Sequence, residues 1–209
     1  MGDAVDGSVL KISQLSIRRV MLVCAFAVAM GLLLSPTPSQ GLEALMNAFE
    51  RSQELYVQGR YEEAIPFAEK ALRLGERELS PNHLNIADLV YVLAALYHAQ
   101  GRYAEAEPLF ERALAIFENA LGPEHPDVAA SLNSLASLYD AQGRYTEAEP
   151  LYKRALAIRE KVFGPDHPDV AQSLENYSVF LRETERAAEA TEMEARAVAI
   201  RAKHAAENP

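Results

Sequence analysis

The chain contains a short motif that recurs at a fixed interval of 42 residues. The motif Gln-Gly-Arg-Tyr begins at Gln58, at Gln100 and again at Gln142. A weaker fourth copy follows after the same interval, where Glu185 and the two residues after it replace Gly-Arg-Tyr. Repeats of this length are typical of proteins built from stacked structural units, each of which buries its apolar face only against its neighbours. We therefore expect the chain from residue 42 onward to form one repeat array, with no second domain.

Each unit has the hydrophobic pattern of two amphipathic helices. In the third unit Leu132, Leu135, Ala136 and Tyr139 follow the i, i+3, i+4, i+7 spacing that places side chains on one stripe of a helix. The pattern predicts a first helix from about residue 125 to residue 141 and a second helix that ends near residue 162. Applied in phase along the chain, it predicts four helix-turn-helix units, at 42–82, 83–124, 125–166 and 167–209.

The connections carry helix-capping signals. Gly143 follows a first helix, and a glycine at that place ends a helix by adopting the left-handed conformation. Asn82, Glu124 and Asp166 stand where we expect the N-cap of the next first helix. A histidine follows each of these three residues, so the histidines also recur 42 residues apart, one in each connection. That spacing separates them along the array, and we assign them to the capping turns and not to a metal site.

Small and aromatic residues recur at fixed places in the two central units. Ala136, Tyr139, Ala148, Tyr152 and Ala155 in the third unit match residues of the same kinds in the second. This skeleton resembles the tetratricopeptide repeat, and the 42-residue period resembles its kinesin-light-chain variety. The resemblance implies an all-α fold, a right-handed α-solenoid of eight helices. It is weakest in the first and last units, as expected of end units that lack a neighbour on one side.

The resemblance also implies a binding site. In this family the first helices of successive units line a concave groove in which peptides lie. Carried over onto this chain, the groove positions with the most distinctive chemistry are Tyr56, Asp88, Tyr91, His98, Asn133, Asp140 and Arg182. These positions lie away from the apolar packing stripe, so we expect folding to depend little on them. For Tyr56 and Tyr91, packing in the core is the alternative.

Composition excludes several other functions. The chain has 20 Lys+Arg against 30 Asp+Glu and a formal net charge of −10, which argues against binding to nucleic acid phosphates. Its one cysteine, Cys24, cannot form an internal disulfide or a multi-thiolate metal site. The glutamates that follow each motif recur in phase with the helices, so they belong to first helical turns and not to a catalytic pair. We predict no enzymatic activity and no cofactor.

The first 41 residues differ in kind from the repeats. Lys11, Arg18 and Arg19 precede an uncharged, apolar run at residues 20–34, and a small-polar stretch follows. This order is the layout of a secretory signal, and the run is shorter than the roughly 20 residues that span a bilayer. We expect residues 1–41 to be a signal peptide or a signal anchor. The repeats would then lie outside the cytoplasm, either exported to the periplasm or exterior or tethered to the membrane through residues 20–34.

Two functions remain open at this point. The first is a non-catalytic adaptor that binds an extended segment of a partner protein in the groove. Because the chain is acidic, that segment is expected to be neutral or basic. The second is a structural array that associates with itself, or caps a larger complex, through its convex or end surface. The sequence leaves the oligomeric state open.

Overall fold

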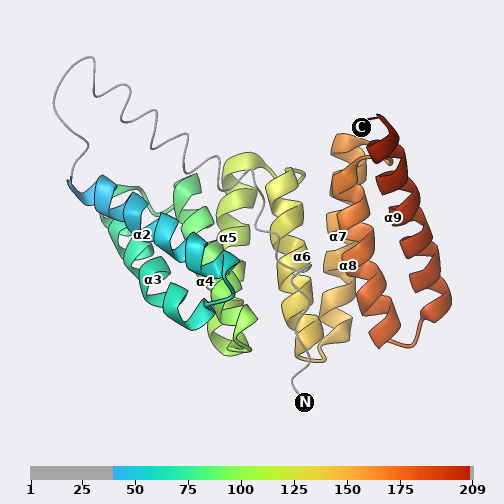
Figure 1. The fold of residues 1–209 in the computed structure, drawn as a ribbon, viewed down its shortest axis with the longest axis horizontal. Helices are drawn as coiled ribbons and strands as arrows, with labels where there is room; N and C mark the ends of the chain where they lie inside the picture. The colour runs from blue at the N-terminus through green and yellow to red at the C-terminus, as the bar shows by residue number, and fades with distance from the viewer. Residues whose placement is uncertain (1–39, 208–209) are drawn as a thin grey trace. The chain divides into compact units, whose positions relative to one another are not determined.

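The computed structural model describes residues 40–207, and within this range every regular element is an α-helix (Figure 1). The all-α helical-repeat fold expected from the sequence is confirmed. The predicted signal or anchor segment lies outside the described residues, except for Gln40 and Gly41 at the start of the first described helix. The helices are α2 (Gln40–Val57), α3 (Tyr61–Glu78), α4 (Leu84–Ala99), α5 (Tyr103–Leu121), α6 (Pro126–Ala141), α7 (Tyr145–Phe163), α8 (Pro168–Glu183) and α9 (Ala187–Glu207).

The helices form two compact units that divide after Ala120. From here on, unit means one of these two halves, and each of the four helix-turn-helix segments is called a repeat. The first unit contains α2 to α5 and the second contains α6 to α9. Within the units, helices that follow one another in the chain pack as hairpins, and α2 lies beside α3 as α8 lies beside α9 (Figure 1). None of the helices in residues 40–207 has both the length and the apolar character needed to cross a membrane.

The turns inside the hairpins share one backbone conformation. Gly59, Gly101 and Gly143 have φ angles of 71°, 70° and 71°, in the left-handed region. At the third of these turns the Gly143 N–H donates to the carbonyl of Asp140, and the next N–H donates to the carbonyl of Tyr139, both at 2.8 Å. These bonds satisfy carbonyl groups that the end of a helix leaves free. In the last hairpin Glu185 takes the same place with φ 62°, although it is not glycine.

The histidines of the connections cap the helices directly. His83, His125 and His167 are the N-cap residues of α4, α6 and α8, in extended backbone conformation. In each, Nδ1 accepts a hydrogen bond from the backbone N–H two residues later, at 3.1 to 3.2 Å. Their predicted role in the capping turns is confirmed. The prediction that Asn82 and its equivalents are the N-caps is wrong by one residue, because the histidine ring itself reaches the free N–H.

Alanines let the two helices of a hairpin approach closely. Ala136 on α6 and Ala148 on α7 have no exposed surface, and the equivalent Ala94 and Ala106 of the first unit are equally buried. Larger apolar side chains fill the space around them. In the second unit α8 and α9 close over a cluster formed by Val170, Ala171, Leu174, Ala197 and Ile200. Burial of such side chains supplies the main stabilising free energy of each unit.

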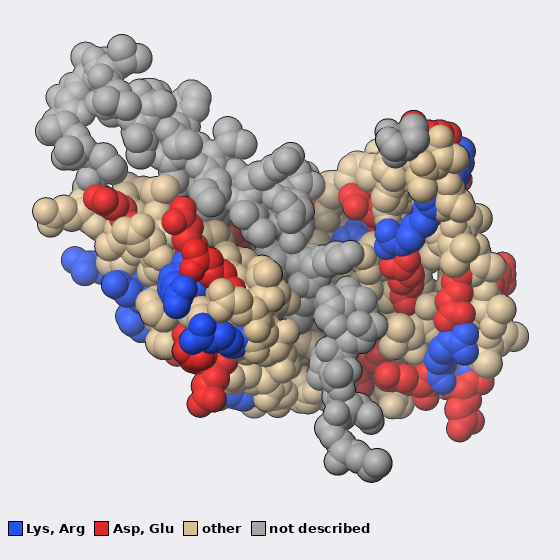
Figure 2. All heavy atoms as spheres, viewed as in Figure 1, with Lys and Arg blue, Asp and Glu red and all other residues tan. Residues whose placement is uncertain are grey.

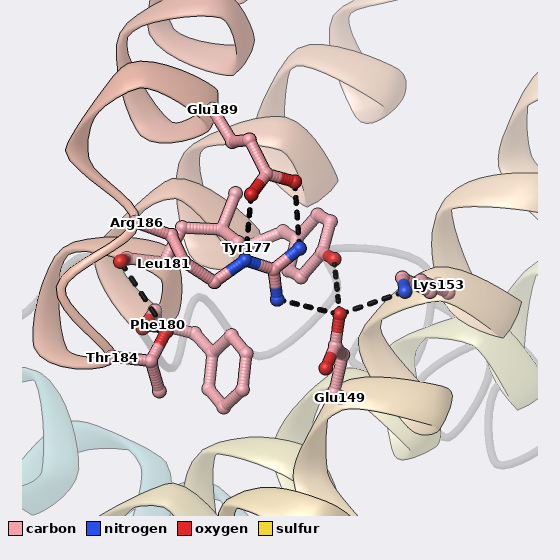
Figure 3. A network of polar contacts seen from close by, with 8 residues as sticks. All are labelled: Glu149, Lys153, Tyr177, Phe180, Leu181, Thr184, Arg186 and Glu189. Carbon is pink, nitrogen blue, oxygen red and sulfur yellow. Dashed lines mark hydrogen bonds and ion pairs between the residues drawn. The ribbon is translucent and has the colours of Figure 1, made fainter.

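A polar network ties the last hairpin to α7 (Figure 3). The Glu149 carboxylate accepts hydrogen bonds from the Tyr177 hydroxyl at 3.0 Å and from the Arg186 guanidinium at 2.7 Å. Lys153, one turn further along α7, lies 2.7 Å from the same carboxylate. The hydrogen bonds from Lys153, from Arg186 and, to a smaller extent, from Tyr177 hold the pKa of Glu149 at about 2, well below its usual range. The network therefore links α7, α8 and the start of α9 through one ionised carboxylate.

Candidate binding face

Four of the predicted groove residues lie in the first unit. Tyr56 is on α2, and Asp88, Tyr91 and His98 are on α4. The Tyr91 ring packs edge-on against Phe110 of α5, with the ring centroids 5.5 Å apart. The His98 ring lies 5.5 Å from the ring of Tyr103 and 6.3 Å from that of Phe110. Both side chains are therefore part of the contact between α4 and α5.

The burial of these residues corrects one expectation. Tyr91 and His98 are each 7% exposed, and Asp88 is 1% exposed. The expectation that folding depends little on them is wrong for Tyr91 and His98, because a buried ring in contact with Phe110 stabilises the hairpin as well as presenting its polar edge. The sequence did not reveal this because α4 is apolar nearly all round, so no polar face marks its outer limit.

Tyr56 and Tyr91 come close together across the first unit. The Tyr56 ring also packs against Tyr61 at the start of α3, with a centroid separation of 5.4 Å. Burial of the Tyr56 hydroxyl, and the nearby Tyr91 and Tyr61 hydroxyls, raise the pKa of Tyr56 above its usual value. The Tyr56 phenol therefore remains neutral at physiological pH.

In the second unit Asn133 is held in a defined orientation. Its Nδ2 donates a hydrogen bond to the Ser173 hydroxyl of α8 at 3.1 Å. Arg159 of α7 donates to the same hydroxyl at 3.0 Å and to the Asp169 carbonyl at 2.9 Å. The Asn133 side chain is 4% exposed, and its Oδ1 has no hydrogen-bond partner among the described residues. Asn133 thus keeps one buried acceptor unused while its donor is fixed.

Asp140 lies on the same face of α6, seven residues further along, and it forms a pair that the sequence did not predict. Asp140 is 8% exposed, and its carboxyl interacts with the carboxyl of Glu183 at the end of α8. Burial, the negative charge of Glu183 and a hydrogen bond to it raise the pKa of Asp140 to about 7. The sequence does mark Glu183 as a departure from the repeat, because the equivalent positions of the two preceding repeats hold Ala99 and Ala141.

Arg182 is engaged inside its own hairpin. Its guanidinium donates two hydrogen bonds to the Glu194 carboxylate of α9, both at 2.6 Å. The bond to Glu194 raises the pKa of Arg182. Beside it, Val179 is 47% exposed and lies one turn earlier on α8. Val179 is therefore exposed enough to contact a bound segment, whereas the Arg182 guanidinium already binds Glu194.

We use the name first-helix faces for the two sets of residues, each taken within its own unit. The residues of the first unit lie on α2 and α4, and those of the second unit lie on α6 and α8. The sets are Tyr56, Asp88, Tyr91 and His98 in the first unit, and Asn133, Asp140, Val179, Arg182 and Glu183 in the second.

The exposed surface around these faces carries charges of both signs. Figure 2 shows acidic and basic side chains interspersed over the visible surface of each unit. Many of them form ion pairs that recur with the repeat, such as Arg60 with Glu63 and Arg144 with Glu147, at 2.6 and 2.8 Å. Within residues 40–207, no group of three or more His, Cys, Asp or Glu side chains is arranged to hold a metal ion.

Comparison with known families supports the repeat assignment. A tetratricopeptide repeat model matches residues 54–119, 89–161 and 141–203. A variant of a putative kinesin light chain with nearly identical TPR-like repeats, from Podosopora anserina, superposes with a TM-score of 0.67 at 27% identity, over 90% of this chain and 88% of that one.

Two further solved structures share the fold at lower identity. BtubC (BKLC) from P. vanneervenii has a TM-score of 0.71 at 23% identity, covering 92% of this chain and 76% of its own. YrrB, described as a TPR protein with an unusual peptide-binding site, has a TM-score of 0.52 at 22% identity, covering 97% of this chain and 88% of its own. A search of the curated proteins finds no significant match.

Proposed function

Because this chain belongs to the tetratricopeptide repeat family, whose repeats generally mediate protein–protein interactions, we propose that it is a non-catalytic adaptor. In this proposal an extended segment of a partner protein lies on a first-helix face. The kinesin-light-chain-like neighbours support the interaction role, and YrrB is an example of the fold that is described with a peptide-binding site.

The observation that carries the proposal is the unused acceptor of Asn133. Buried polar groups in proteins nearly always have a hydrogen-bond partner, and leaving one without a partner costs about 1–3 kcal/mol. The Asn133 Nδ2 bonds the Ser173 hydroxyl, and the Asn133 Oδ1 has no hydrogen-bond partner among the described residues. A backbone N–H of a bound segment would satisfy this oxygen. An extended segment offers such a group at every residue except proline.

The roles of the other polar residues support an adaptor over an enzyme. The three connection histidines use Nδ1 for helix capping. The glutamates that follow each motif pair with the arginine three residues earlier, as Arg102 does with Glu105 and Arg186 with Glu189. Helix capping and ion pairing thus explain why these histidines, arginines and glutamates recur from repeat to repeat, and no catalytic role is needed to explain it.

The charge of the chain supports a neutral or basic partner segment. With a formal net charge of −10, the protein repels acidic segments and nucleic acid, and it attracts basic ones over distances of about a Debye length. Binding of a basic segment should therefore weaken as salt is raised.

Export of the repeats is a separate proposal that rests on the sequence alone. Lys11, Arg18 and Arg19 before the apolar run at 20–34 would keep the N-terminus inside, which directs residues 42–209 out of the cytoplasm. A fusion of residues 1–60 to alkaline phosphatase tests it, since that reporter is active only after export. An inactive fusion, with an active cytoplasmic reporter at the same place, contradicts the proposal.

Two exposed valines provide a matched test of the binding face. Val179 is 47% exposed on the face of the second unit, and Val198 is 67% exposed on α9. Val179→Arg should weaken binding of a partner captured by the full-length protein by tenfold or more, because a long charged side chain blocks the face. Val198→Arg makes the same chemical change elsewhere and should leave binding unchanged. If Val198→Arg alone removes the partner, the binding surface lies at the end of the array, and the structural-array function takes the place of the adaptor.

A further inference from the structure

We propose that Asp140 and Glu183 together form a receptor for a cationic side chain, an arginine guanidinium or a lysine ammonium, on the bound segment. The inference rests on the proposed adaptor function and adds to it the chemical identity of one contact. It assigns a specific role to Glu183, for which the repeat pattern gives none.

The geometry places two carboxyl groups at the same end of two neighbouring helices. Asp140 is the penultimate residue of α6 and Glu183 is the last residue of α8. The carboxyl-terminal end of a helix carries a partial negative charge from its free carbonyl groups. The dipoles of α6 and α8 therefore add to the negative potential at this place and favour a cation there.

Basic side chains close by in the chain are engaged elsewhere. Arg182 binds Glu194, and Arg186 binds Glu149 and Glu189. Among the described residues, neither carboxyl of the pair forms an ion pair with a lysine, an arginine or a histidine. The Glu149 carboxylate, by contrast, has two such partners. Within residues 40–207, the pair of Asp140 and Glu183 therefore has no internal counter-ion.

A second observation points to a ligand. Asp140 is more than nine-tenths buried, and its Oδ1 has no hydrogen-bond partner among the described residues. On the same face of α6, seven residues before, Asn133 also keeps a buried oxygen without a partner. The Asp140 oxygen and the exposed Glu183 carboxylate suit a charged, donor-only group, and guanidinium and ammonium are charged side chains of this kind. The Asn133 oxygen lies about 10 Å further along α6 and would meet another part of the segment.

Binding of a cation should release a proton. Without a ligand, one proton on Asp140 relieves the repulsion of the two carboxyl groups, and the raised pKa of about 7 reflects this. When a cation enters, both groups ionise and the proton passes to solvent. Affinity for the cation should therefore increase as pH rises from 6 to 8, since less protein carries the proton that must leave.

The probe is a pair of acetylated, amidated peptides of Gly and Ser with one central residue, arginine in the first and its neutral isostere citrulline in the second. Each is titrated into the full-length protein while NMR follows the carboxyl resonances of Asp140 and Glu183. The arginine peptide should bind about tenfold more tightly than the citrulline peptide, in line with the strength of charge-assisted hydrogen bonds. Calorimetry in two buffers of different ionisation enthalpy at pH 6.5 should show proton release for the arginine peptide only.

Two double variants separate this site from general acidity. Asp140→Asn with Glu183→Gln should lose the preference for arginine and the proton release. Glu185→Gln with Glu192→Gln removes the same two formal charges from the exposed surface nearby and should keep both. Glu183→Gln alone changes an exposed residue and repeats the test without altering the buried one.

Equal binding of the two peptides to the wild type overturns the receptor, as does an unchanged arginine preference in the Asp140–Glu183 variant. In either case, a partner that Val179→Arg releases still supports the adaptor function. If instead the protein prefers the arginine peptide and releases a proton, but Val179→Arg does not release the captured partner, the site binds cations and the adaptor proposal fails.

Discussion

The guanidinium of Arg186 bridges two carboxylates, donating to Glu149 on α7 at 2.7 Å and to Glu189 on α9 at 2.7 and 2.6 Å (Figure 3). The equivalent Arg60 of the first hairpin binds only its near neighbours Glu63 and Gln58 among the contacts that the structure describes. Arg186 thus joins the turn of its own hairpin to the preceding helix, α7.

We predict that Arg186→Ala lowers the thermal unfolding midpoint more than Arg60→Ala does, because only the former breaks a link between hairpins.

The pKa of Glu149 is lowered to about 2, so the contribution of this carboxylate to folding stability is present above the unfolded pKa near 4.5 and is lost as pH falls towards 2. The stability difference between wild type and Glu149→Gln should shrink from pH 7 to pH 2. A difference independent of pH would show that the ionised carboxylate is not what stabilises the contact.

Asp140 has the opposite pH dependence. Its pKa is raised to about 7, so its proton is bound more tightly in the folded state than in the unfolded state. Ionising this carboxyl beside Glu183 and near Tyr152 therefore costs stability, a cost that is absent below pH 4 and grows as pH rises towards 7. We expect Asp140→Asn to be increasingly more stable than wild type from pH 4 to pH 8 in urea unfolding. Parallel curves over this range contradict the raised pKa.

The histidine caps can be tested by substitution at one connection. His125→Ala removes the acceptor for the Asp127 N–H and should reduce the free energy of unfolding by about 1 kcal/mol. His125→Asn supplies another side-chain acceptor at the N-cap and should recover most of that loss. Equal losses for the two variants, measured by chemical denaturation, would mean that the ring contributes through packing and not through capping.

Glu185 offers a gain of stability. It occupies the left-handed position that glycine holds in the other three hairpins, with φ 62°. Glu185→Gly should raise the free energy of unfolding by roughly 0.5–1 kcal/mol, since glycine adopts this conformation without a Cβ penalty. Gly143→Ala makes the reverse change at φ 71° and should lower it by about 1 kcal/mol. An added Cβ at Gly143 meets no atom within 4 Å, so a loss there, measured by chemical denaturation, reports backbone strain alone.

The fold was predictable because the residues that end and begin the helices recur in successive repeats. Gly143 and its equivalents mark the end of each first helix, and the alanines of the packing stripe mark where helices approach, so the eight helices follow from the periodicity. The sequence alone did not predict that histidine is the N-cap residue. The asparagine or acidic residue before it is also a suitable N-cap, and only the backbone conformation decides between the two.

The binding face was predictable in position but not in environment. The repeat phase places Asn133 and Asp140 on one face of α6, but the sequence does not show that Ser173 orients the amide or that Glu183 meets the carboxyl. Those partners come from α8, 40 or more residues away, and they depend on how neighbouring repeats pack. Sequence spacing within one helix cannot report such contacts.

The adaptor function requires that a partner protein lies on a first-helix face. A photoreactive amino acid placed at residue 179 or at residue 162 of the full-length protein tests it most directly in cells. Val179 and Val162 are 47% and 46% exposed, so accessibility does not distinguish them, whereas only Val179 lies on the face. We expect covalent protein adducts from position 179 and none from position 162. Adducts from position 162 with none from position 179 would contradict it.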